Sequence, residues 1–230
     1  MQTQYGFKRG TGTRDAIFIV RRIIDQCMMG KEQQMIFLAL DWAKAFDAIT
    51  PACLIQALRR FGIPEHTANI VNAIYSHRLF YVADRDSESK LHQQASGISQ
   101  GCPLSPFLFV IMMSVLMSDA KESLQSKHNI QLSPNLVCHE VLYADDTLLI
   151  DIHGSNLQLY MQCIAEEGKS YGLSLNVSKL ECMPVRCQTY LIAEDGSQII
   201  VIVLLVSAIA VLLCLLLSPV SYHRIVSHVA

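Results

Sequence analysis

The stretch VLYADDTLLI, residues 141–150, decides the fold assignment, because two adjacent carboxylates interrupt a run of apolar side chains. The valine, leucine, tyrosine and isoleucine residues on both sides are typical of a β-strand. Buried carboxylates are costly without a partner, and neighbouring aspartates repel each other unless a cation lies between them. Asp145 and Asp146 therefore indicate either a metal-binding pair or a polar hairpin turn whose carboxylates face water.

A third acid, Asp41, ends the apolar run MIFLALD at residues 35–41, which is typical of a buried strand. Aspartate at such a position can cap the following helix. It can also join Asp145 and Asp146, because Mg²⁺ prefers oxygen ligands and is commonly held by carboxylates and phosphates. Two such ions can activate a hydroxyl group and stabilise the leaving group of an in-line displacement.

The remaining segments predict an α+β fold with a mostly antiparallel sheet packed on helices. Helical spacing of apolar residues or a proline start predicts helices at residues 12–29, 51–63, 64–78, 103–124 and 155–173. Residues 79–94 and 137–152 are predicted to form hairpins, and residues 174–185 an extended segment. The chain of 230 residues has a net charge of −2, which argues neither for nor against nucleic acid. Its eight scattered cysteines favour free thiols in a reducing compartment.

An apolar run, IIVIVLLVSAIAVLLCLLL at residues 199–217, marks a break in composition. Its length and composition predict a transmembrane helix, with a buried pair of strands as the alternative. We therefore predict a first domain at residues 1–198, a single membrane-spanning segment at 199–217 that contacts the lipid bilayer, and a short tail at 218–230. Membrane localisation follows from this assignment.

Three motifs in order resemble the palm of the reverse transcriptases of non-LTR (LINE-like) retrotransposons. They are LALDWAKAFDAI at residues 38–49, GISQGCPLSPFLFVIMMSVL at 97–116 and VLYADDTLLI at 141–150. QYGFKRGTGTRDAI at 4–17 and YGLSLNVSKLECM at 171–183 resemble the flanking blocks of that family. The resemblance covers residues 4–198, and the ordered set around QGCPLSP is far more specific than YADD alone. It implies an RNA-directed DNA polymerase that adds dNTPs to a DNA primer on an RNA template by two-metal chemistry.

The resemblance also implies the residues that hold the metal. Asp41, Asp145 and Asp146 match the metal-binding carboxylates, with the backbone carbonyl of Trp42 as a further ligand. The ions would be two Mg²⁺, for which Mn²⁺ can substitute.

Further roles follow for the nucleotide. Phe46 matches the aromatic residue that blocks a 2′-hydroxyl, although an ordinary core phenylalanine is the alternative. Gln100 and Gly101 match the turn that contacts the nascent base pair, and Tyr143 would line the primer end. Lys179 matches a proton donor to pyrophosphate, with a solvent-exposed lysine of no special role as the alternative.

The sequence departs from the family pattern at both ends. The upstream fingers segment, the thumb, an endonuclease and a zinc knuckle are not recognisable, so we expect a palm with incomplete fingers. The alternative function is a catalytically inactive, membrane-anchored retrotransposon relic or scaffold. If the apolar run is an artefact of gene prediction, the expected location becomes the cytoplasm or nucleus.

Overall fold

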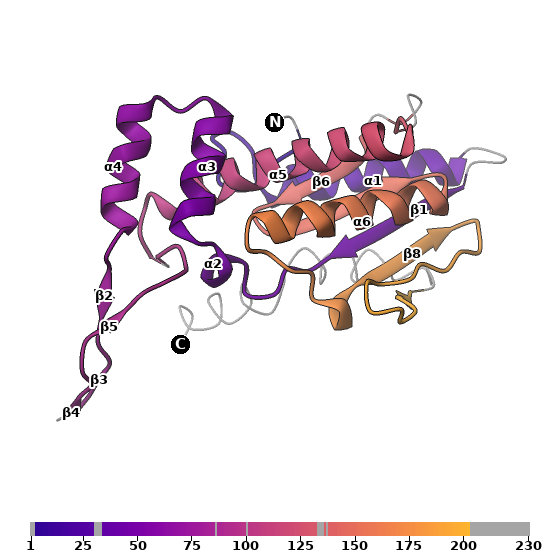
Figure 1. The fold of residues 1–230 in the computed structure, drawn as a ribbon. Coiled ribbons are helices and arrows are strands. Elements are labelled where there is room, and N and C mark those ends of the chain that lie inside the picture. The colour runs from indigo at the N-terminus through magenta and orange to yellow at the C-terminus, as the bar shows by residue number, and fades with distance from the viewer. Residues whose placement is uncertain are drawn as a thin grey trace.

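A five-stranded sheet in the order β6-β7-β1-β8-β9 forms the centre of the chain (Figure 1). All neighbours pair antiparallel except β8 and β9, which are parallel. The computed structural model describes residues 3–29, 34–85, 87–99, 101–132, 136 and 138–202. The strands of the sheet are β1 (Met35–Leu40), β6 (Glu140–Tyr143), β7 (Asp146–Asp151), β8 (Glu181–Val185) and β9 (Ile200–Val201).

Helices cover both faces of this sheet. Helix α1 packs on one face with its buried residues Ala16, Val20, Ile23 and Cys27, which recur at helical spacing as predicted. The other face is covered by the long α5 and by α6, which pack against each other and against α3. The helices are α1 (Thr13–Met29), α2 (Ala45–Ala48), α3 (Pro51–Phe61), α4 (Glu65–Tyr75), α5 (Ser105–His128), α6 (Gly154–Ser170) and the 3₁₀ turn η1 (Val177–Lys179).

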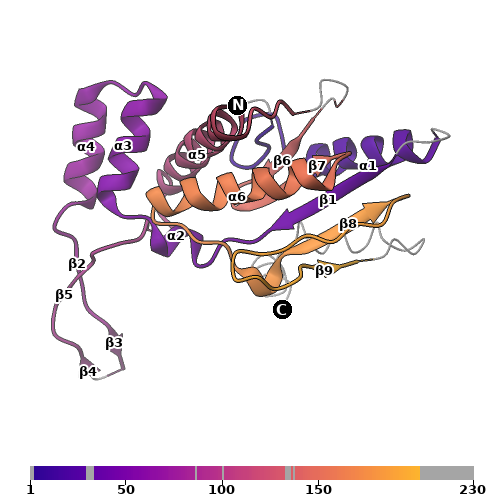
Figure 2. The ribbon, with the colours of Figure 1, turned by 45° about the vertical axis from the view of Figure 1, so that its right-hand side comes forward.

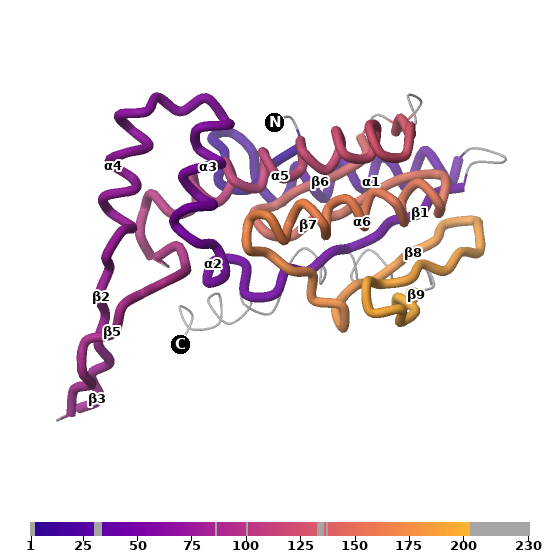
Figure 3. Tube along the Cα trace, in the orientation of Figure 1, coloured from indigo at the N-terminus to yellow at the C-terminus, as the bar shows by residue number. Residues whose placement is uncertain are grey.

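A second part of the chain projects from one end of the sheet. Helices α3 and α4 stand side by side there, and a narrow hairpin extends beyond them, as the trace in Figure 3 shows. The hairpin contains the pairs β2–β5 and β3–β4, within the range predicted for it. These strands are β2 (Leu79–Phe80), β3 (Ala83–Asp84), β4 (Ser87–Glu88) and β5 (His92–Gln93).

The predicted transmembrane helix at residues 199–217 is wrong. Ile199 is buried in the core, and its backbone N–H donates to the Leu191 carbonyl at 2.9 Å. The next two residues form β9 beside β8 (Figure 2), and the Ile202 N–H donates to the Cys182 carbonyl at 2.8 Å. β-Branched isoleucine and valine fit a strand at the sheet edge well, so the apolar run begins by completing the sheet.

The remainder of that run and the tail at 218–230 lie outside the described residues. Across the described part of the chain, every helix is too short or too polar to cross a bilayer. The predicted membrane localisation and lipid contact therefore have no support. The α+β architecture with an antiparallel sheet packed on helices agrees with the prediction.

Candidate active site

The tight turn between β6 and β7 carries Asp145 and Asp146. Ala144 adopts a left-handed conformation with φ of 57°, which few non-glycine residues do. Tyr143 pairs with Asp146 across the hairpin. The chain thus forms a hairpin here, but its two carboxylates are half-buried rather than open to water.

Asp41 lies beside this turn because of the register of the sheet. The last pair of β1 and β7 is Leu40 opposite Thr147. Because the strands are antiparallel, continuing this register by one position puts Asp41 opposite Asp146. Directly opposed residues on antiparallel strands have Cβ atoms about 5 Å apart. The negative charge of Asp41 accordingly raises the pKa of both Asp145 and Asp146.

The environment of the pair disfavours its ionised form. Burial is the largest cause of the raised pKa of Asp146, which reaches about 8, and the charges of Asp145 and Asp41 add to it. Burial also raises the pKa of Asp145, which a backbone hydrogen bond partly offsets. A group of carboxylates that repel each other in this way gains from a proton or from a bound cation.

The donor set fits a hard divalent cation, since it consists of carboxylate oxygens. In the arrangement of the described residues, however, no three carboxylate, imidazole or thiol groups lie close enough to hold one ion. The carboxylates can raise each other's pKa without forming a metal cluster, because charge repulsion acts over longer distances than the roughly 2 Å between Mg²⁺ and its ligands. Convergence of Asp41, Asp145 and Asp146 on one metal site therefore stays a prediction.

Lys179 provides the positive charge next to Asp41. Lys179 ends the 3₁₀ turn η1, which leads into β8 beside the end of β1, and the Asn176 N–H in front of that turn donates to the Asp41 carbonyl at 2.8 Å. The Lys179 Nζ lies 3.5 Å from Asp41 Oδ2, and 57% of its side chain is exposed. An ammonium group held this way can reach solvent or a ligand at the edge of the site.

Phe46 lies in α2, directly after the loop that follows β1. Its ring stacks on that of Phe109 from α5, with ring centroids 4.3 Å apart and planes 15° apart. Its backbone carbonyl accepts a hydrogen bond from the Ile98 N–H at 2.7 Å. Phe109 is fully buried whereas Phe46 is half-buried, so Phe46 packs on the core and remains partly accessible.

Two other predicted residues also have a defined place. The Trp42 side chain is buried, with its Nε1 donating to Thr147 Oγ1 at 3.4 Å, so only its backbone remains a candidate ligand. Gly101 is exposed in a turn before α5 with φ of 86°, a conformation that favours glycine. Gln100 lies outside the described residues.

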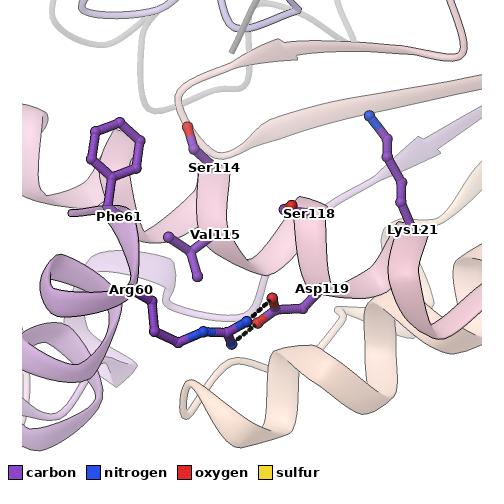
Figure 4. A pocket seen from close by; sticks show the side chains of 7 residues that line it. All are labelled: Arg60, Phe61, Ser114, Val115, Ser118, Asp119 and Lys121. Atoms are coloured by element: carbon purple, nitrogen blue, oxygen red, sulfur yellow. Dashed lines mark hydrogen bonds and ion pairs between the residues drawn. The ribbon is translucent and has the colours of Figure 1, made fainter.

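A cavity of about 390 Å³ lies elsewhere, between the end of α3 and the middle of α5 (Figure 4). An Arg60–Asp119 ion pair lies at its side, and the Tyr171 hydroxyl also donates to Asp119 at 2.6 Å. None of the predicted site residues is among its described lining residues, which are Arg60, Phe61, Ser114, Val115, Ser118, Asp119 and Lys121.

Sequence reasoning assigned no role to two residues that contact the site. Phe109 supports Phe46, and Gln4 hydrogen-bonds to the backbone of Ala144. The apolar character of residues 103–124 indicated a buried helix but no partner for any one ring. No local pattern could reveal the contact of Gln4, because its partner lies 140 residues further along the chain.

Comparison with protein families matches residues 1–194 to the family described as reverse transcriptase (RNA-dependent DNA polymerase). A Pol polyprotein from the type-1 retrotransposable element R2 of Popillia japonica is 28% identical over 177 residues, which are 75% of this chain and 24% of that protein. The RNA-directed DNA polymerase from the mobile element jockey of Drosophila melanogaster is 24% identical over 183 residues, which are 76% of this chain and 19% of that protein. The chain thus spans less than a quarter of either relative.

Solved structures share the fold. A structure of apo telomerase from Candida tropicalis matches 82% of this chain and 37% of its own, with a TM-score of 0.59 and 15% identity. Telomerase from Candida albicans, solved with a fragment of telomeric RNA, has the same TM-score and 17% identity over 82% of this chain and 32% of its own. The α+β arrangement of this chain is therefore a fold that these telomerase chains also adopt.

Proposed function

Because this chain belongs to the reverse transcriptase family, with relatives among non-LTR retrotransposons, we propose that it forms the palm of an RNA-directed DNA polymerase. It adds deoxynucleotides to the 3′ end of a DNA primer on an RNA template. One observation carries the proposal: the register of β1 against β7 brings Asp41 beside the turn with Asp145 and Asp146.

Reverse transcriptases use divalent metal ions. In this chain Asp41, Asp145, Asp146 and the Trp42 carbonyl would hold two Mg²⁺ or Mn²⁺ ions. Such ions activate the primer hydroxyl and neutralise charge on the leaving pyrophosphate. The raised pKa values of Asp145 and Asp146 support this role, because carboxylates that repel each other favour a cation between them.

Lys179 is the proton donor in this proposal. Its ion pair with Asp41 holds the ammonium group beside the carboxylates, and its exposure leaves room for a nucleotide phosphate. A cation at this place binds the triphosphate and can transfer a proton to the departing pyrophosphate oxygen.

The chain selects the sugar through Phe46. Stacking on the buried Phe109 holds the ring of Phe46 in place, and the hydrogen bond from the Ile98 N–H to the Phe46 carbonyl holds its backbone. A rigid ring edge beside the site blocks a 2′-hydroxyl. Gln100 and Gly101 contact the nascent base pair, and Tyr143, next to the carboxylate turn, lines the primer end.

Phe46→Val is expected to admit ribonucleotides, lowering discrimination between dNTP and rNTP by about 10- to 100-fold. The smaller side chain removes the steric block and leaves the carboxylates in place. Primer extension with each nucleotide at a range of concentrations measures the ratio. Phe18→Val, at an exposed position of α1, is the matched control. Unchanged discrimination in Phe46→Val would mean that Phe46 is an ordinary core residue.

The proposed activity is tested by primer extension with the full chain on an RNA template with a labelled DNA primer. We expect extension with dNTPs that requires Mg²⁺ or Mn²⁺ and stops on addition of a chelator. A chain that binds Mn²⁺ but never extends the primer would contradict the proposal and favour the inactive scaffold.

A further inference from the structure

Residues 3–6, which we call the N-terminal clamp, lie along the outer edge of β6. The Tyr5 N–H donates to the Leu142 carbonyl at 2.8 Å, and the Leu142 N–H donates to the Thr3 carbonyl at 2.9 Å. Gln4 and Leu142 thereby form a parallel β-bridge. The clamp is thus fixed to the strand that leads into the carboxylate turn.

The side chain of Gln4 binds the backbone of the residue before Asp145. Its Oε1 accepts hydrogen bonds from the Ala144 N–H at 3.0 Å and from the Gly6 N–H at 2.8 Å. Its Nε2 donates to the Ala144 carbonyl at 3.5 Å, the outer limit of a hydrogen bond. Gln4 is 2% exposed, so if Ala144 turned away its buried amide would lose both hydrogen bonds to Ala144 and keep only the one from Gly6.

Gly6 allows the clamp to approach the turn this closely. A Cβ atom at Gly6 would lie 2.4 Å from the backbone nitrogen of Ala144 and 3.1 Å from Gln4 Oε1. A contact of 2.4 Å with a backbone atom forces the two segments apart. Glycine at this position therefore serves the contact with Ala144.

Ala144 needs such support because its left-handed backbone is unfavourable for an alanine. Strained conformations persist where surrounding contacts determine them, and they occur often at functional sites. The backbone of Ala144 directs the chain into Asp145 and Asp146, so its orientation sets the direction of both carboxylates. A group that orients metal ligands in this way acts on metal affinity without touching the metal.

We propose that Gln4 is a positioning residue of the site: the N-terminal clamp holds Ala144 in its left-handed conformation and so fixes Asp145 and Asp146 for metal binding. The part concerning metal rests on the proposed function. The part concerning Ala144 rests on the described contacts alone.

The test measures Mn²⁺ binding to the full chain by electron paramagnetic resonance, with the metal as the only ligand. Gln4→Met keeps the length of the side chain and removes all its hydrogen bonds, so Mn²⁺ should bind about 10- to 100-fold more weakly. Thr3→Val is the matched control, because it removes the bond from Thr3 Oγ1 to Glu140 Oε1 at 2.9 Å and leaves Gln4 intact. Its Mn²⁺ affinity should remain that of the unchanged chain.

Equal Mn²⁺ affinity of Gln4→Met and the unchanged chain would overturn the proposal, as would an equal loss in Thr3→Val. If Gln4→Met fails to fold, Gly6→Ala tests the same contact and should show the same loss.

Hydrogen exchange separates this inference from the proposed function. If Asp145→Asn leaves Mn²⁺ binding unchanged, the metal site is wrong, but faster exchange of the Ala144 amide in Gln4→Met still supports the clamp. Unchanged exchange there overturns it.

Discussion

Asp146→Asn is expected to stabilise the metal-free chain above pH 8 by on the order of 3 kcal/mol. The pKa of this carboxyl rises from 3.8 to about 8 in the fold. A raised pKa in an acid means that the folded chain holds a proton that the unfolded chain has released. The stability contributed by that proton is fully present below pH 3.8 and is lost as the pH rises through about 8. Each pKa unit of this rise corresponds to about 1.4 kcal/mol of unfolding free energy. We expect roughly half of the free energy that the whole rise represents, because solvent at this half-buried group screens the repulsion.

Urea unfolding with a chelator present, between pH 5 and pH 9, measures this effect. The unchanged chain should lose stability over that range, and Asp146→Asn should lose much less. Asp25→Asn, at a partly exposed site on α1 paired with Arg21, is the control and should follow the unchanged chain. Saturating Mn²⁺ should restore the stability of the unchanged chain at pH 8, since a ligand that binds the folded state stabilises it. Parallel pH curves for Asp146→Asn and the unchanged chain would contradict the prediction.

Asp41→Asn is expected to lower the rate of primer extension by at least about 100-fold, since even groups that only orient metal ligands contribute about 10- to 100-fold. Asparagine keeps the size of the side chain and removes the charge that faces both Asp146 and Lys179. The variant therefore weakens metal binding and leaves Lys179 without its partner. Its fold should persist, because the loss of one charge relieves the repulsion on Asp145 and Asp146.

Single-turnover primer extension and Mn²⁺ titration measure the two consequences of Asp41→Asn separately. Asp25→Asn again is the control, with unchanged extension expected. If Asp41→Asn extends the primer at the unchanged rate, Asp41 has no catalytic role, and the alternative that it caps the following helix remains. Weakened extension with unchanged Mn²⁺ affinity would contradict the assignment of Asp41 as a metal ligand and leave its pair with Lys179 as the cause.

Much of the fold could be predicted because it depends on local patterns. Residues 35–41 indicated a buried strand ending in an acid, and β1 is that strand. The spacing of Ala16, Val20 and Ile23 predicted the helix α1. The hairpin at 137–152 formed as predicted, since apolar strand residues surround a short polar turn. The family assignment depended on the order of three motifs, and it is confirmed.

Other features depend on contacts between distant segments and could not be predicted. The apolar run from Ile199 predicted a membrane helix, and only the pairing of residues 200–201 with the edge of β8 shows that the run begins as a strand. The stacking of Phe46 on Phe109 depends on how α5 packs against α2. The burial of Gln4 depends on its contact with Ala144. The predicted contact of Gln100 with the nascent base pair stays a prediction, because Gln100 lies outside the described residues.

The N-terminal clamp has a consequence for the order of folding. It joins residues 140 positions apart, and closing so long a loop has an entropic cost before any contact is made. Contacts of this range slow folding, whereas the hairpin of β6 and β7 closes within a few residues. During synthesis the clamp leaves the ribosome long before its partner strand exists. The carboxylate turn can therefore form early as a hairpin, but it acquires its final geometry only when a segment made about 140 residues earlier returns to it.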